Sequence, residues 1–81
     1  MARFWTEETT YRVVVEIDGY EQVHEATLED DHSPWPESSA SCSCGFSYGP
    51  RRRGARDALL GHFSELGASD VRPAGTNRKP V

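Results

Sequence analysis

The sequence predicts an α+β fold in which a three-stranded antiparallel sheet packs against one C-terminal helix. Three observations carry this prediction: a hairpin pattern over residues 11–28, a third alternating segment over 39–48, and a helical stripe that ends near Gly67. The 81 residues suffice for one small domain with a thin core. We therefore expect an N-terminal arm over 1–10, a single β-β-β-α domain over 11–67, and a flexible tail over 68–81.

The hairpin is predicted from alternation and from its turn. Apolar and polar side chains alternate over residues 11–17, which is typical of a half-buried strand. Asp18-Gly19 follows at once and suits a two-residue type I′ turn, because both residues tolerate positive φ. With this turn, Val13 faces His24, and both lie on the core side of the sheet. A histidine in that place needs a partner for its ring nitrogens, whether protein, water or metal.

Residues 29–38 are expected to form a loop that carries Trp35 between two prolines. Each proline biases the residue before it towards extended backbone, and three consecutive acids precede His32. Trp35 either covers the core as a lid, which we favour for so small a core, or stands exposed as an anchor for a partner.

The third strand and the helix follow each other closely. Alternation over 39–48 places Cys42 and Cys44 on the inner side of the third strand, and Gly49-Pro50 ends it. A helix is predicted from about Gly54 to Leu66 because its apolar residues recur at i, i+3 and i+4. The stripe on its inner side consists of Ala55, Ala58, Leu59, His62, Phe63 and Leu66.

Two thiols and an imidazole in this region suggest a zinc site. Zinc takes four ligands in tetrahedral geometry, and Cys42, Cys44 and His62 offer three of them. The fourth is either His24, which the hairpin register places on the core side, or His32, which has the adaptable loop. Such an ion would be structural, because four protein ligands leave no open position for catalysis.

The spacing of the cysteines leaves a second interpretation open. A zinc knuckle usually has two residues between its cysteines, and this chain has one, although the glycine that follows would let backbone N–H groups turn towards sulfur. Cysteine is also among the most buried residue types, so strand alternation alone could place Cys42 and Cys44 in the core. A thiol redox role is a weaker alternative, because Cys-x-Cys is not the Cys-x-x-Cys redox motif.

The segment from Cys42 to His62 resembles small proteins of actinobacteria and their phages. These carry Cys-x-Cys-Gly-aromatic, then a Gly-Pro or Ser-Pro step, then a helix with alanines that ends near a histidine. The resemblance implies a metal ion and no specific task, and it adds a phage or mobile-element origin to the expectation. Many of those proteins have a second histidine in the helix, whereas here His62 stands alone. The matching residues are Cys42, Cys44, Gly45, Phe46, Gly49-Pro50, Ala55, Ala58 and His62.

Charge divides the chain into an acidic and a basic half. The net charge is −8 over residues 1–40 and +4 over 41–81. Such asymmetry indicates two working surfaces or self-association, or simply a solvated surface of mixed sign. Arg51, Arg52, Arg53 and Arg56 cluster where the helix is predicted to begin, a place that already favours phosphate.

These arginines open a nucleic-acid alternative. The β-β-β-α order with a basic helix start resembles the later part of a double-stranded-RNA-binding domain, in topology only, since the first helix of that family is lacking. The overall charge of −4 works against binding to a nucleic-acid backbone. The simpler interpretation is that the arginines pair with the acidic half, within the chain or across a dimer.

We therefore expect a small non-enzymatic binding module, an adaptor or regulator that contacts another protein or a second copy of itself. Nucleic acid is the alternative partner, and neither a membrane nor a small-molecule substrate is expected. The sequence shows no phosphate-binding loop and no His-Glu-x-x-His motif. No secretory leader or membrane-length apolar run is evident, so we expect a cytoplasmic protein with reduced thiols. The residues expected to contact the partner are Arg51, Arg52, Arg53, Arg56 and Trp35.

Overall fold

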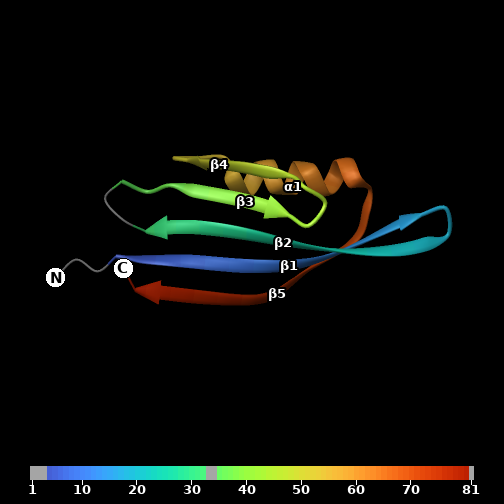
Figure 1. The fold of residues 1–81 in the computed structure, drawn as a ribbon, viewed down its shortest axis with the longest axis horizontal. Coiled ribbons are helices and arrows are strands. Elements are labelled where there is room, and N and C mark those ends of the chain that lie inside the picture. Colours follow the sequence, from blue (N-terminus) through green and yellow to red (C-terminus); the bar gives the residue numbers. More distant parts are fainter. Residues whose placement is uncertain (1–3, 33–34, 81) are drawn as a thin grey trace.

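The computed structural model describes residues 4–32 and 35–80, and it is built mainly of β-strands. One antiparallel sheet has the order β4-β3-β2-β1-β5, and one helix packs on it (Figure 1). Residues 1–3, 33–34 and 81, which belong to the expected arm, loop and tail, lie outside the described residues. The elements are β1 (Trp5–Ile17), β2 (Tyr20–His32), β3 (Ser38–Cys42), β4 (Ser47–Arg51), α1 (Ala55–Leu66) and β5 (Ala68–Pro80).

The expectation of three strands and a C-terminal helix is therefore wrong: the sheet has five strands, and the helix precedes the last of them. The segment expected as a flexible tail forms β5, which pairs with β1 along its length. Its prolines and glycine hide the strand from pattern analysis. An edge strand tolerates proline because one side of its backbone needs no donor. Register shifts opposite Thr10/Tyr11 and Val14/Val15 further obscure the period of two.

Strands β1 and β2 are also longer than alternation indicates. Trp5 pairs with His32 and Thr10 with Thr27, so part of the expected arm and part of the expected loop form the far end of the hairpin. Polar side chains occupy both faces there, which is why no apolar period marks these residues as strand. Residues 5–10 are nevertheless all partly buried, because β1 has a paired strand on each side.

The hairpin turn and its register agree with the prediction. Asp18 and Gly19 have φ of 51° and 83°, as a turn with two left-handed residues requires. Ile17 pairs with Tyr20, and Val13 pairs with His24. The register therefore places the His24 side chain on the same face as the buried Val13.

The segment expected as the third strand is two strands joined by a tight turn. The amide of Cys42 donates to the carbonyl of Phe46 at 2.9 Å, and the amide of Gly45 donates back to the carbonyl of Cys42 at 3.0 Å. Gly45 has φ of 104°, a conformation that other residues rarely adopt. Cys44 consequently lies in the turn itself rather than on a strand.

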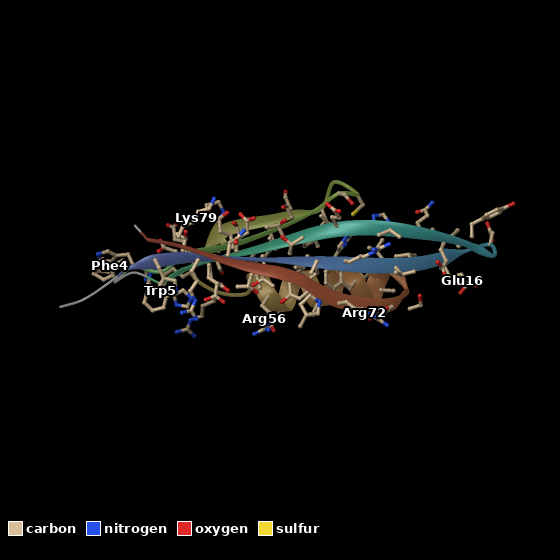
Figure 2. All side chains as sticks on the ribbon, turned by 90° about the horizontal axis from the view of Figure 1, so that it is seen from below. Phe4, Trp5, Glu16, Arg56, Arg72 and Lys79 are labelled. Carbon is tan, nitrogen blue, oxygen red and sulfur yellow. The ribbon has the colours of Figure 1, made fainter. Side chains whose placement is uncertain are left out.

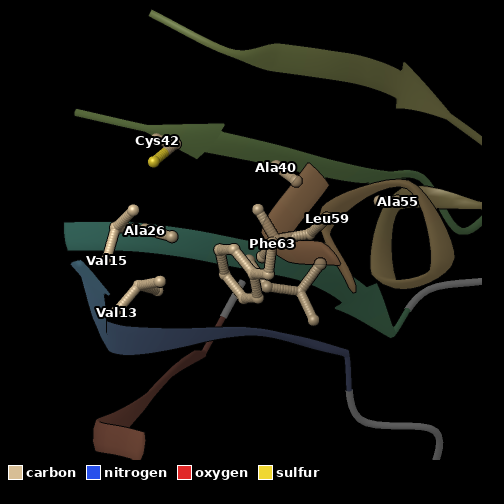
Figure 3. Close-up of a cluster of buried hydrophobic side chains, with 9 residues drawn as sticks. Val13, Val15, Ala26, Ala40, Cys42, Ala55, Leu59 and Phe63 are labelled. Atoms are coloured by element: carbon tan, nitrogen blue, oxygen red, sulfur yellow. The ribbon is translucent and has the colours of Figure 1, made fainter. Parts of the chain in front are cut away.

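Helix α1 covers one face of the sheet and closes the core (Figure 3). Its predicted extent is confirmed, and it ends at Gly67, whose amide donates to the carbonyls of Phe63 and Ser64. Burying Leu59 and Phe63 contributes about 2 to 3 kcal/mol each to the hydrophobic stabilisation. The buried residues are Val13, Val15, Ala26, Leu28, Ala40, Cys42, Ala55, Leu59 and Phe63.

Candidate metal centre

Two of the candidate ligands reach the site from neighbouring strands. Cys42 is the last residue of β3 and pairs with Ala26, so its thiol points into the core beside the helix. His24 lies two residues before Ala26 on β2, on the same face and beyond the end of β3. Its ring is half-buried, next to the turn that follows Cys42.

The β3–β4 turn brings Cys44 to the same place. Ser43 fixes the turn against β2: its amide donates to the Glu25 carbonyl at 2.8 Å, and its Oγ accepts from the Glu25 amide at 3.1 Å. As a result, the ligand atoms of His24, Cys42 and Cys44 all lie within 4.8 Å of one another. Ligand atoms around a tetrahedral zinc ion are roughly 3.3 to 3.8 Å apart. The three side chains could therefore hold a metal ion after a small contraction.

His62 meets this group from the helix. Its Nε2 lies 3.0 Å from the Sγ of Cys44, across a gap of eighteen positions in the chain. Its ring stacks on Phe46, with centroids 4.2 Å apart and planes 10° from parallel. The aromatic residue after the Cys-x-Cys-Gly motif thus fixes the orientation of a histidine, a role that the sequence analysis did not assign to Phe46.

The electrostatics of the group suit a cation. Burial raises the pKa of the Cys42 thiol above its usual range, and the adjoining Cys44 thiol adds to this effect. A buried thiolate beside a second sulfur is costly without a compensating positive charge. A bound divalent ion supplies that charge and reverses the preference in favour of thiolate.

The alternative fourth ligand, His32, lies elsewhere. It is eight residues from His24 along β2, which corresponds to about 26 Å of strand. There its ring stacks on Trp5 with centroids 4.7 Å apart, and its Nε2 is 3.8 Å from a carboxylate oxygen of Glu7. The structure therefore brings His24 to both cysteines and His62 to Cys44, and leaves His32 with other partners.

The expected partner-binding residues lie between the end of β4 and the first turn of α1, and in the connection between β2 and β3. Arg51 ends β4 and pairs with Ser38, and its guanidinium lies 5.5 Å from the centre of the Tyr48 ring. Arg56 projects from the first turn of α1 (Figure 2). Trp35 lies in the connection between β2 and β3 and is 76% exposed, so it does not serve as a lid over the core.

A scan against protein-family models found no match to this chain, and searches of curated proteins and of solved structures found none either. The geometry of the described residues therefore carries the functional argument. No helix among these residues is both long enough and apolar enough to cross a membrane.

Proposed function

We propose that this chain is a small non-enzymatic binding module, an adaptor or regulator, whose fold is held together by one structural zinc ion. Its partner surface lies where β4 stops and α1 begins, and includes the exposed Trp35. The proposed zinc ligands are His24, Cys42, Cys44 and His62, and the proposed partner-binding residues are Arg51, Arg52, Arg53, Arg56 and Trp35.

One observation carries the metal part of this proposal. Ligand atoms of His24, Cys42 and Cys44 converge within 4.8 Å, and His62 Nε2 touches Cys44 Sγ. Two thiols and two imidazoles are a donor set typical of structural zinc, whereas calcium and magnesium prefer oxygen.

The positions of the ligands indicate what the ion would do. One ligand comes from β2, one from the end of β3, one from the β3–β4 turn and one from the middle of α1. An ion bound by all four ties the helix to the sheet at a point where the core is thin. Binding free energy at such a site becomes folding free energy, which a chain of 81 residues needs. With every position taken by protein, the ion has no place for a substrate.

Cobalt substitution tests the ligand set directly. Titration of the reduced, metal-free protein with Co²⁺ should give the intense visible absorption of a tetrahedral site and a thiolate-to-metal charge-transfer band, both displaced by one equivalent of Zn²⁺. His24→Ala and His62→Ala should each weaken these bands or shift their wavelengths, because loss of one ligand gives the site a more open geometry.

His32→Ala is the matched control for the cobalt experiment, because it removes the third histidine of the chain at a site about 26 Å away. Its spectrum should equal that of the unmodified protein. Absent charge-transfer bands in the unmodified protein, or equal losses in all three variants, would contradict the proposed ligand set.

A further inference from the structure

The four arginines at the start of α1 form a free cationic patch. Among the described residues, ion pairs join Glu7 to His32 and Arg78, and Asp70 to Arg72, but none involves the patch. All four side chains are exposed, and one acid, Asp57, shares the first turn of α1 with Arg56. The expectation that they pair with the acidic half of the chain is therefore not met within the described residues. The patch consists of Arg51, Arg52, Arg53 and Arg56.

Exposed aromatic side chains lie at the same end of the sheet. Trp35 occupies the short connection between His32 and Ser38, and Ser38 pairs with Arg51 of the patch. Figure 1 shows that this connection, the end of β4 and the start of β1 are at one end of the molecule. Phe4, 39% exposed, immediately precedes β1 at that end. The indole of Trp35 is accessible on most of its surface, as a stacking platform must be.

We propose that this end of the molecule binds single-stranded nucleic acid, with phosphates on the arginine patch and an unpaired base stacked on Trp35. Proteins that bind single strands combine a positive groove along the backbone with aromatic side chains under successive bases. Arginine suits both tasks, because its planar guanidinium pairs with phosphate and stacks on rings, as Arg51 does on Tyr48. This inference names the partner class for the binding module proposed above and so rests on that proposal.

The surroundings of Trp35 favour a nucleic acid over a protein partner. The core of a protein interface is apolar and depleted in charge, with aromatic anchors packed among other apolar groups. Trp35 is instead followed by Pro36 and Glu37, and then by the small residues Ser38, Ser39 and Ala40. Strand β4, which pairs with Ser38, ends in Arg51. An exposed indole at the end of the sheet where β4 stops at Arg51 matches the stacking arrangement better than it matches a hydrophobic hot spot.

Acidic side chains limit the footprint to the face of the sheet that carries α1. Register places the side chains of Glu8, Glu25 and Glu29 on the face opposite the core, away from α1. These carboxylates repel phosphate, so the strand must remain near the arginine patch. A single strand can follow so short a patch and turn away, whereas a stiff duplex presents stacked bases that Trp35 cannot reach.

Fluorescence anisotropy with a labelled thymidine strand of about 12 nucleotides tests the proposal on zinc-loaded protein. If all four arginines neutralise phosphates, log K should fall with log salt with a slope of about −3, a loss of roughly 50-fold between 50 and 200 mM salt. The R51A/R52A/R53A variant should reduce the slope to about −0.7. Trp35→Ala should weaken binding by roughly tenfold with the slope unchanged, because it removes stacking and no charge.

A matched variant removes the same charge from the other face. Arg12 and Arg72 are paired neighbours that line a shallow depression there, and Lys79 pairs with Thr6. Figure 2 shows Lys79 on the opposite side of the sheet from Arg56. R12A/R72A/K79A should retain affinity within about threefold, because it leaves the patch intact. Equal losses in the two triple variants would overturn the site, and tighter binding of a duplex of the same length would overturn the single-strand preference.

The zinc content of each sample separates this inference from the proposed function. Zinc-loaded, folded protein that ignores the thymidine strand but binds a polyglutamate peptide through the arginine patch would overturn the nucleic-acid inference and leave the binding module in place. Protein that binds the strand through the arginines yet takes up no zinc would support the inference and overturn the metal centre.

Discussion

At the scale of single residues, neighbouring groups hold each proposed ligand in place. The hairpin register fixes His24, the backbone pair between Cys42 and Phe46 fixes the turn, and stacking on Phe46 fixes His62. Three of these four ligands could be chosen from residue type and spacing, and His24 required the register of the predicted hairpin as well. The choice between His24 and His32 depends on the length of β2. The outer end of this strand is polar, so the sequence pattern does not reveal that length.

Phe46→Ala tests the importance of this support. Removing the ring leaves His62 free to rotate while all four proposed ligands remain. Loss of an orienting neighbour typically weakens metal binding by about 10-fold to 100-fold. Competition with a chromophoric zinc chelator measures this change. Phe4→Ala, an aromatic truncation at the other end of the sheet, should leave zinc affinity unchanged, and equal affinities for the two variants would exclude an orienting role for Phe46.

At the scale of elements, prediction succeeded where one face of an element is apolar and failed where it is not. The hairpin near its turn and helix α1 have clear periods, because each buries one side. The outer halves of β1 and β2 are held by backbone pairing between mostly polar residues, and β5 contains prolines, a glycine and two register shifts, so no period can be detected in either. The β3–β4 turn had one signal, Gly45, whose positive φ allows the chain to reverse.

Two glycine substitutions test the backbone geometry of the elements. Gly61 is exposed within α1, and a Cβ there would meet nothing within 4 Å, so Gly61→Ala should stabilise the protein by up to about 1 kcal/mol through helix propensity. Gly49 has φ of 82°, and a Cβ there would lie 2.5 Å from the Ser38 carbonyl oxygen. Gly49→Ala should cost more than about 1 kcal/mol.

Urea unfolding of both glycine variants, monitored by tryptophan fluorescence, provides the measurement. Opposite shifts of the midpoint with unchanged slope would support the geometry. A neutral Gly49→Ala would show that the chain takes another course through β4, where Gly49 lies against Ser38 of β3.

At the scale of the whole molecule, the sheet is much longer than the helix that covers it. The overall dimensions are 53 × 21 × 16 Å, and α1 has only 12 residues. The helix therefore covers only part of the sheet, and it carries both Arg56, in its first turn, and the proposed ligand His62, near its middle. The sequence shows that acidic residues predominate in the first half of the chain and basic residues in the second, but it does not show where the fold places these charges.

Pairing of β5 with β1 predicts protection of a segment that sequence analysis expected to be flexible. Backbone amides of β5 that face β1 should exchange with deuterium far more slowly than those of an unstructured chain, because opening them requires loss of the ladder. Exchange followed by NMR resolves single residues. The opposite edge of β5 is the internal control, since its amides face solvent. Rapid exchange along both edges would contradict the five-stranded sheet.

The most direct test of the central claim is the zinc content of protein purified without chelator, measured by elemental mass spectrometry beside thermal unfolding with and without EDTA. We predict one zinc ion per chain and a lower unfolding temperature after chelation, because an ion that joins α1 to the sheet contributes to folding. Substoichiometric zinc together with identical unfolding in the presence of EDTA would contradict the claim and leave Cys42 as an ordinary core residue and Cys44 as an exposed residue of the turn.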